Sequence, residues 1–328
     1  MKKLRFAALC LAVLLGFSLC GCTERMVERQ SFALDTFISV KIFSGGDEED
    51  AEAALQRVDA CEQLLSAHRA GSDIDRINMS GGEAIPVDEL TERVVRGAME
   101  LSTLSGGALD VTLYEVSKLW DYKSDSPRVP TDEEIAQALA YTGMERVALQ
   151  NHAIAAEGVK IDLGAVAKGA IGDEARKTLQ QKGVKSALLN LGGNIITLGD
   201  KPGGSGWVIA IDDPNGDGTV GTLRFSGSMA VATSSGTQRF FIVENKTYHH
   251  ILDPETGYPA DSGLASVTIL APDGLTADAL STAVFVMGED KAREMFATHG
   301  FAEMEISAVL VRADGTVSLL GDADFTEN

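Results

Sequence analysis

The sequence predicts an α+β fold built around a largely antiparallel sheet. The inventory of helix-like and strand-like segments is mixed, and strand-like runs between residues 187 and 270 follow one another closely. This order favours an α+β arrangement over a doubly wound parallel sheet. No linker-like change in composition and no repeat of fixed period divides the chain, so we expect one globular domain.

The bulk composition is that of a globular protein with a marked acidic excess. Of the 328 residues, 45% are hydrophobic and 23% are charged, and the formal net charge is −20. This balance is normal for a chain that can bury a sizeable core. The negative charge argues against a nucleic-acid partner, which would require a basic surface. An anionic ligand would need local help from backbone N–H groups, a lysine or arginine, or a metal ion.

The first 21 residues have the plan of a bacterial lipoprotein signal peptide. A short basic region precedes an apolar run over residues 6–19, which is too short and too early for an ordinary spanning helix. The sequence then reads Leu-Cys-Gly-Cys, which resembles a lipoprotein processing site and makes Cys22 the expected lipidated first residue. A conventional secretory signal cleaved nearby is the alternative. Lipidation would hold the mature protein on the outer face of the cell membrane, on the periplasmic side if there is an outer membrane.

The remaining boundaries follow from the same features. We expect residues 22–30 to form a tether, residues 31–322 the single domain, and residues 323–328 an acidic tail. Cys61 is the one cysteine outside the signal and the lipidation site, so no internal disulfide is expected. Its place on the apolar face of a predicted helix indicates a small buried hydrophobic residue.

The first half of the domain contains one predicted strand followed by helices. Largely alternating apolar residues predict a strand over residues 31–43. The acidic run at residues 47–50 suits the positive end of a helix dipole, and apolar residues at helical spacing continue that helix. A second helix is predicted over residues 91–104 and ends at a Gly-Gly turn. Thr131, with Glu134 three residues later, predicts a capping box that begins a third helix.

The second half reads mainly as strands, followed by helical segments and a hairpin. Apolar runs predict strands over residues 147–155, 187–194, 207–211, 230–233 and 239–244. Helical spacing of apolar residues predicts helices over residues 277–287 and 291–299. A hairpin with strands at residues 308–312 and 317–320 is expected to turn at Asp314-Gly315.

Asp278 and Thr282 lie four residues apart in the first of these late helices. On a helix they share one face, one turn apart. A carboxylate and a hydroxyl oxygen that face the same way suit a hard cation such as Mg²⁺, which takes oxygen ligands and usually keeps phosphate or water in its shell. Taken alone, the pair has a simpler explanation, with Asp278 favoured by the helix dipole and Thr282 bonded to its own backbone.

Three further segments are candidate ligand contacts. Asp110 follows a Gly-Gly turn, where the backbone can approach a flat or phosphorylated ligand closely. Residues 160–169 read as strand, glycine-containing turn and helix, and a helix start with glycines and Lys168 is a ready anion site. An exposed surface role for Lys168 explains that residue equally well. The polar loop 66–78, which carries His68, is either a ligand contact or an ordinary loop.

Six motifs, taken together and in this order, resemble the ApbE family of bacterial flavin transferases. They cover nearly all of residues 31–320, and their number and order make the match specific, which one motif alone would not. The motifs are Gly106-Gly107-Ala108-Leu109-Asp110-Val111-Thr112, Ile161-Asp162-Leu163-Gly164-Ala165-Val166-Ala167-Lys168-Gly169, Leu189-Asn190-Leu191-Gly192-Gly193-Asn194, Ala232-Thr233-Ser234, His250-Ile251-Leu252-Asp253-Pro254-Glu255-Thr256-Gly257-Tyr258-Pro259 and Ala277-Asp278-Ala279-Leu280-Ser281-Thr282.

The resemblance implies an FAD:protein FMN transferase that requires Mg²⁺. Such enzymes split FAD between its phosphates, release AMP, and join FMN by a phosphoester to a threonine or serine of a partner protein. The implied partners are flavoprotein subunits of membrane redox complexes that carry a Ser/Asp-Gly-Ala-Thr/Ser-type site. The resemblance also implies two similar sub-halves within the domain, with the flavin cleft between them.

The same resemblance implies roles for particular residues. Asp278 and Thr282 would supply metal oxygens, a backbone carbonyl near Ala165 would complete the site, and Ser281 stands where some members carry a second acidic ligand. Cleavage of a pyrophosphate puts charge on phosphate oxygens, which Mg²⁺ would stabilise. The residues implied to hold FAD are Leu34, His68, Ala108, Leu109, Asp110, Asp162, Lys168 and Ile251.

Two histidines complete the set of candidates. The accepting hydroxyl is a poor nucleophile until a base takes its proton, and histidine suits that task near neutral pH. His250, beside the Asp-Pro turn, is the candidate base, whereas His249 is expected to stack or to face solvent. His68 falls where flavin-transferring members often carry a tyrosine against the flavin ring. Variation there accompanies relatives that hydrolyse FAD to FMN and AMP, so an FAD pyrophosphatase is the second expectation and a non-catalytic flavin-binding lipoprotein the third.

Overall fold

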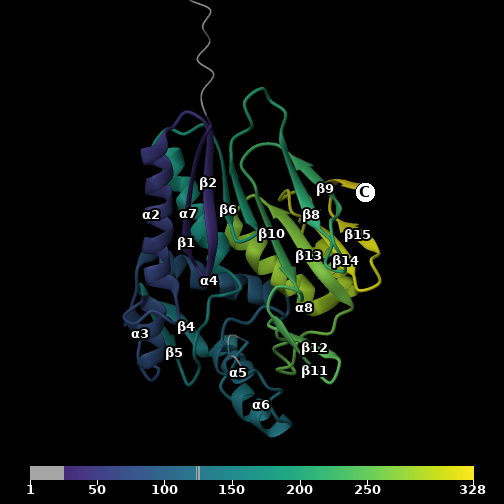
Figure 1. The fold of residues 1–328 in the computed structure, drawn as a ribbon. Coiled ribbons are helices and arrows are strands. Elements are labelled where there is room, and N and C mark those ends of the chain that lie inside the picture. The colour runs from purple at the N-terminus through teal and green to yellow at the C-terminus, as the bar shows by residue number, and fades with distance from the viewer. Residues whose placement is uncertain (1–25, 123, 125) are drawn as a thin grey trace, which may run out of the picture.

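The computed structural model describes residues 26–328 except Lys123 and Asp125. Its fold is α+β with a large antiparallel sheet, which confirms the fold class that the sequence predicts (Figure 1). The expected signal peptide and Cys22 lie outside the described residues. Within the described part of the chain, no helix is both long enough and apolar enough to cross a membrane.

The main sheet has eight strands, and every neighbouring pair is antiparallel. The strand order is β1-β2-β6-β7-β10-β13-β14-β15, in which β1–β2, β6–β7 and β14–β15 are hairpins. The strands are β1 (Val27–Ala33), β2 (Thr36–Ser44), β6 (Ser186–Leu191), β7 (Asn194–Leu198), β10 (Ala230–Ser235), β13 (Leu264–Ala271), β14 (Ser307–Arg312) and β15 (Val317–Leu320).

Alternating apolar side chains let the main sheet pack on both of its faces. In β10, Ala230 and Ala232 belong to the large cluster shared with the helices, whereas Val231 belongs to a second cluster on the opposite face. Successive residues of a strand point to opposite faces, which explains this division. The second cluster is covered by the three-stranded sheet β16-β9-β8. Its strands are β8 (Trp207–Asp212), β9 (Thr219–Phe225) and β16 (Asp324–Glu327).

Long helices cover the other face of the main sheet (Figure 1). The helix α2 (Glu48–Leu65) packs against β1 and against α7 (Ala167–Gln181). In turn α7 packs against α8 (Gly274–Thr298), which lies on β10 and β13. Cys61 of α2 is fully buried, as expected. The remaining helices are α3 (Asp73–Met79), α4 (Glu89–Leu104), α5 (Tyr114–Trp120), α6 (Asp132–Leu139) and the short 3₁₀ helix η2 (Met144–Arg146).

Two small sheets lie at the lower end of the molecule in Figure 1. One has the order β3-β5-β4, and the other is the hairpin β11-β12. The predicted capping box of Thr131 and Glu134 is present at the start of α6, which occupies the same end. The strands are β3 (Ile85–Pro86), β4 (Val147–Gln150), β5 (Ala153–Ala156), β11 (Phe240–Val243) and β12 (Lys246–His249).

Two predicted strands are in fact hairpins. The strand predicted over residues 31–43 is interrupted after Ala33, because Leu34 and Asp35 take positive φ angles of 55° and 58° and turn β1 back onto β2. Asn151 and His152 do the same between β4 and β5, within the strand predicted over residues 147–155. Turns with two positive φ angles match the twist of a hairpin and favour Asn, Asp or Gly, so leucine gave no turn signal.

Both ends of the domain were predicted wrongly. Residues 27–30, assigned to the tether, form the first part of β1 and pair with β2. Residues 324–327, assigned to the acidic tail, form β16 and pair with β9. The two predicted late helices are joined in α8, with a kink at Gly288 where φ is 79°. Edge strands with exposed faces carry weak apolar patterns, which explains why these ends resembled free segments.

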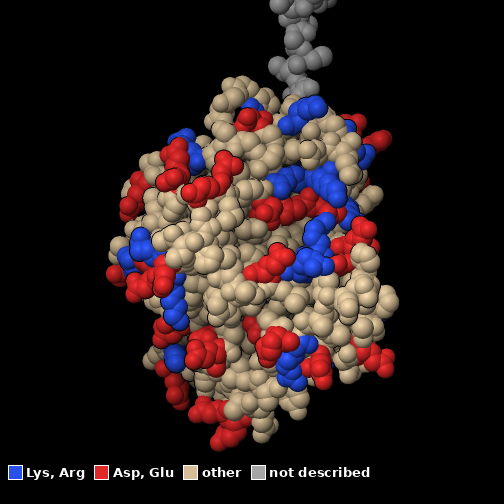
Figure 2. All heavy atoms as spheres, turned by 180° about the vertical axis from the view of Figure 1, so that it is seen from behind, with Lys and Arg blue, Asp and Glu red and all other residues tan. Residues whose placement is uncertain are grey.

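Acidic and basic side chains lie side by side on the protein surface, although the formal net charge is −20. Figure 2 shows acidic and basic side chains interspersed on one face of the molecule. Ion pairs include Arg96–Glu92 at 2.6 Å and Arg293–Glu289 at 2.7 Å. An anionic ligand would therefore respond mainly to the groups nearest to it, because salt screens more distant exposed charges.

Helices α7 and α8 cross at a pair of glycines, which makes the contact sensitive to a single methyl group. A Cβ atom built on Gly169 would lie 1.9 Å from the carbonyl oxygen of Gly274. We expect Gly169→Ala to lower the free energy of unfolding by at least about 2 kcal/mol, because backbone must move to admit the methyl group. Urea denaturation measures this loss.

The matched control for that substitution is Gly97→Ala in α4. There the added Cβ would lie 2.7 Å from Cδ2 of Leu275, the far end of a flexible side chain. The control should cost less than Gly169→Ala, since a side chain can rotate away and alanine favours a helix. Equal losses in both variants would contradict the importance of the backbone contact.

Candidate functional site

The candidate metal ligand Asp278 is buried near the start of α8 and is held by three donors. Its side chain accepts hydrogen bonds from the backbone N–H of Gly169 at 2.9 Å and from Nδ2 of Asn194 at 2.8 Å. The ammonium of Lys168 lies 3.2 Å from Oδ1. Only 4% of Asp278 is exposed, so these donors compensate the carboxylate for its lost hydration. The start of α7 and Asp278 of α8 are therefore in direct contact.

Hydroxyl groups surround the next turn of α8. Ser281 is fully buried, and its Oγ donates to the carbonyl oxygen of Asp278 at 2.8 Å. Ser234 of β10 lies 2.8 Å from Oγ of Ser281 and 3.2 Å from Oγ1 of Thr282. Thr282 is half-buried and is the more open of the two α8 hydroxyls. Ala165 lies in the turn that leads into α7.

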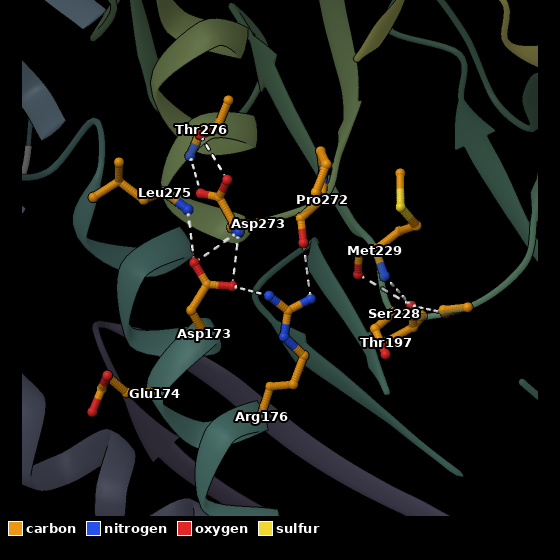
Figure 3. A network of polar contacts seen from close by, with 12 residues as sticks. Asp173, Glu174, Arg176, Thr197, Ser228, Met229, Pro272, Asp273, Leu275 and Thr276 are labelled. Carbon is orange, nitrogen blue, oxygen red and sulfur yellow. Dashed lines mark hydrogen bonds and ion pairs between the residues drawn. The ribbon is translucent and has the colours of Figure 1, made fainter. Parts of the chain in front are cut away.

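A second carboxylate fixes where α8 begins (Figure 3). Asp173 of α7 accepts hydrogen bonds from the backbone N–H groups of Gly274 at 2.8 Å and of Leu275 at 3.1 Å. Arg176 donates to the same carboxylate at 2.8 Å and to the carbonyl of Pro272 at 3.1 Å. Burial raises the pKa of Asp173 to about 6. Because Asp278 follows only four residues after Gly274, this network positions it.

The segment that contains Ile161 and Asp162 contacts both α3 and the loop that carries Asp110. The side chain of Asn78 bonds both backbone groups of Ile161, at 2.7 and 2.8 Å. The backbone N–H of Asp162 donates to the carbonyl of Val111 at 2.7 Å. Burial raises the pKa of Asp110, although its carboxylate accepts two hydrogen bonds from Thr112. Asp110 and Asp162, both candidate contacts for FAD, therefore lie on neighbouring segments.

The two adjacent histidines have different environments. Nδ1 of His250 lies 3.3 Å from the carbonyl oxygen of Arg239. Burial first, and then the positive charges of Arg239 and of Lys168, lower the pKa of His250 to about 4. His249 instead contacts the carbonyl of Ala260 at 3.1 Å and packs edge-on against Phe285, so it neither stacks face to face nor faces solvent freely.

An aromatic side chain that the sequence did not indicate stands beside His68. The rings of exposed His68 and Tyr114 have centroids 6.0 Å apart, and Nζ of Lys160 lies 5.5 Å from the Tyr114 centroid. Tyr114 begins α5, a short helix absent from the predicted elements. A cavity of about 610 Å³ adjoins this region and is lined in part by Asn78, Glu115 and Lys160.

The other candidates for FAD contacts have the following positions. Leu34 lies half-buried in the turn between β1 and β2, and Ile251 is buried and accepts the N–H of Ala260 at 2.9 Å. Ala108 is half-buried and Leu109 is buried beneath it. Among the described residues, no hydrogen bond or ring contact joins Leu34 or His68 to the Asp278 cluster.

Sequence reasoning assigned no role to several residues of the cluster. Asn194 and Ser234 both ended recognised motifs, so their position after buried strands was an available signal. Gly169 contributes a backbone N–H group, and a backbone donor cannot be recognised from the residue type. Tyr114 and Asp173 gave no signal, because the first follows an unpredicted turn and the second resembles an ordinary helix residue.

The α+β fold gathers at this site a buried carboxylate, nearby hydroxyls, a lysine and a backbone N–H group at a helix start, which are groups able to hold a cation or a phosphate. A family model described as "ApbE family" matches residues 34–310. The chain belongs to the ApbE family.

Relatives in sequence support the same membership. An FAD:protein FMN transferase of Haemophilus influenzae is 32% identical over 316 residues, which span 90% of each chain. One of Treponema pallidum is 34% identical over 305 residues, covering 85% of this chain and 84% of the relative.

Solved structures agree with the fold. The crystal structure of the ApbE protein of Thermotoga maritima has a TM-score of 0.83 at 35% identity, covering 90% of this chain and 96% of that one. The flavin transferase ApbE of Vibrio cholerae has a TM-score of 0.79 at 27% identity, with the same coverage of 90% and 96%.

Proposed function

We propose that this chain is an Mg²⁺-dependent FAD:protein FMN transferase, which releases AMP and joins FMN by a phosphoester to a threonine or serine of a partner protein. The family membership and the relatives of that name support the activity. The structural observation that carries it is the buried carboxylate of Asp278, bonded to the start of α7 and followed by hydroxyls one turn later.

The residues present fit a magnesium ion. Asp278, Ser281, Thr282 and a main-chain carbonyl near Ala165 would be its candidate oxygen ligands. Among the described residues, no group of three or more His, Cys, Asp or Glu side chains could hold a metal. The ion would therefore keep phosphate oxygens of FAD as further ligands, a common arrangement for Mg²⁺. When bound, it supplies stabilisation of the charge that develops on those oxygens.

The chain's own residues account for the remaining chemistry. His250 is neutral near pH 7 and can accept the proton of the acceptor hydroxyl. The hydroxyl oxygen then forms a bond to the FMN phosphorus, and the bond from that phosphorus to the bridging oxygen of AMP breaks. Lys168 would bind phosphate oxygens at the start of α7, where the positive end of the helix dipole also favours anions.

The flavin would occupy a cleft between two similar sub-halves of the domain. Leu34, His68, Asp110, Asp162 and Ile251, with Ala108 and Leu109, would contact FAD in this arrangement. The approach of Tyr114 to His68 supports an aromatic platform there, because both rings can stack on a flat ligand.

One observation favours a second function, the hydrolysis of FAD to FMN and AMP. His68 is exposed and replaces the tyrosine that transferring relatives often carry, so water could compete with the acceptor hydroxyl. Both functions share the phosphate chemistry, and they differ only in the group that takes the FMN.

A lipid anchor on Cys22 would hold the enzyme at the outer face of the cell membrane. The beginning of β1 lies at the upper end of the molecule in Figure 1, whereas β11, β12 and α6 lie at the lower end. An enzyme tethered through its N-terminal side would thus direct the lower end away from the bilayer.

The test combines FAD, Mg²⁺ and an acceptor domain that carries the Ser/Asp-Gly-Ala-Thr/Ser-type site. We expect the intact mass of the acceptor to rise by that of an FMN group and AMP to appear in equal amount, both lost on adding EDTA. AMP and free FMN without acceptor would identify the hydrolase. FAD that stays intact for hours under Mg²⁺ would contradict both and indicate a binding lipoprotein.

A further inference from the structure

The β11–β12 hairpin exposes an apolar face next to the candidate base. Phe240 is 46% exposed and Ile242 is 61% exposed. Phe240 and Ile242 flank Phe241 in β11, and successive side chains of a strand point to opposite faces. Phe240 and Ile242 therefore lie on one face, and Phe241 lies on the other. Thr247, directly opposite Ile242 in β12, belongs to the same face and is also exposed. We call Phe240, Ile242 and Thr247 the hairpin face.

The opposite face of the hairpin is anchored in an aromatic cluster. Phe241 and Tyr248 lie with their ring centroids 6.2 Å and 5.5 Å from that of Trp120, which is fully buried. Nε1 of Trp120 donates to the carbonyl of Gly257 at 2.9 Å. This packing fixes the hairpin against the body of the protein, so the hairpin face is presented on a firm support and not on a free loop.

The hairpin is connected directly to the site. The backbone N–H of His250 donates to the carbonyl of Arg239 at 3.1 Å, and Phe240 is the next residue. In the described chain β11 pairs only with β12, so one edge of each strand keeps unpaired backbone groups. Such an edge can accept an extended polypeptide, whose backbone supplies the missing hydrogen bonds.

We propose that the hairpin face is the docking surface for the acceptor protein, and that it binds an extended segment beside the hydroxyl that receives FMN. This inference rests on the proposed function and specifies its partner. Apolar side chains of that segment would cover Phe240 and Ile242, and its backbone would pair with an edge of the hairpin. The acceptor hydroxyl would thereby be brought towards His250.

Two other occupants fit the hairpin face less well. Stable dimers bury about 800 Å² on each partner, which a face of three exposed side chains does not provide. A lipid surface cannot pair with the strand edge, and the hairpin lies at the end of the molecule away from the start of β1 (Figure 1). A brief enzyme–substrate encounter needs only a small surface.

The experiment measures transfer to the purified acceptor domain and to a peptide of about fifteen residues that contains its flavinylation segment. The test variants of the full chain are Ile242→Ser and the double variant Phe240→Ser with Ile242→Ser, and Ile242→Thr keeps the β-branched shape. Val208→Ser is the matched control, because Val208 is an apolar strand residue that is 40% exposed in β8, outside the hairpin.

We expect the double variant to raise the KM for the acceptor domain at least tenfold, with an unchanged Kd for FAD and nearly unchanged kcat. Ile242→Ser should have a smaller effect in the same direction, Ile242→Thr a still smaller one, and Val208→Ser none. The unchanged FAD affinity also shows that the variants are folded.

Several results would overturn the docking inference alone. One is an unchanged KM for the acceptor domain in both Ile242→Ser and the double variant, and another is an equal rise of that KM in Val208→Ser. A third is that the substitutions weaken self-association, or binding to phosphatidylglycerol vesicles, and leave binding of the acceptor unchanged. A wild-type enzyme that transfers no FMN to either acceptor would instead overturn the proposed function.

Discussion

Asp278→Asn is expected to lower the rate of FMN transfer by about 10³-fold or more. The variant keeps the shape of the side chain but removes the only carboxylate charge in the cluster of Gly169, Asn194 and the α8 hydroxyls. That charge is the strongest attraction the site offers to a cation, and electrostatic stabilisation of the reacting phosphates depends on it. Steady-state transfer and calorimetric Mg²⁺ titration measure the two consequences separately.

The matched control for this substitution is Asp290→Asn. Asp290 is an exposed aspartate later in the same helix, so its replacement changes the net charge equally without touching the site. The control should transfer FMN at the wild-type rate and bind Mg²⁺ normally. Wild-type activity and an unchanged Mg²⁺ requirement in Asp278→Asn would remove the metal assignment.

The substitution His250→Gln is expected to lower kcat for transfer by about 10²–10⁴-fold, which is the second large effect. Glutamine can still bond to the carbonyl of Arg239 but cannot take the acceptor's proton near pH 7. FAD affinity should stay close to wild type, since the substitution removes a proton acceptor and no charge at that pH. His299→Gln, in an exposed histidine at the end of α8, is the control.

The lowered pKa of His250 gives this prediction a pH signature. With a folded-state pKa of about 4, the imidazole stays neutral above about pH 5, so kcat should show no inflection from His250 near 6.5. An inflection near 6.5 that His250→Gln abolishes would show that the base titrates as a solvent-exposed histidine.

The same shift predicts a dependence of stability on pH. The folded pKa of about 4 lies below the ordinary value of 6.5, so the unfolded chain binds the proton more tightly between those values. The contribution is therefore complete above pH 6.5 and is lost as the pH falls towards 4, by up to about 3 kcal/mol. His250→Gln should flatten the fall in urea midpoint over this window. An unchanged slope would contradict the lowered pKa of His250.

The residue pattern alone predicted the helices whose start signals and apolar spacing lie in consecutive residues. The acidic start of α2, the capping box of α6 and the spacing in α8 are local features, and each appears where it was expected. The turn at Leu34 and the helix α5 were missed, because their conformations depend on neighbouring segments more than on their own residue types. The edge strand β16 was missed for the same reason, since an acidic sequence becomes a strand only when β9 is available to pair with it.

The sequence by itself determined the family, the fold class and the oxygen-bearing face of α8, because ordered motifs and helical spacing are written in consecutive residues. The tertiary structure decided which groups meet that face. Lys168, Asn194 and Ser234 come from three elements far apart in the chain, and only the crossing of α7 and α8 and the pairing of β7 with β10 bring them to Asp278 and its neighbouring hydroxyls. The tertiary structure also decided that His250 is half-buried beside positive charges, since desolvation depends on neighbours that the local sequence does not specify.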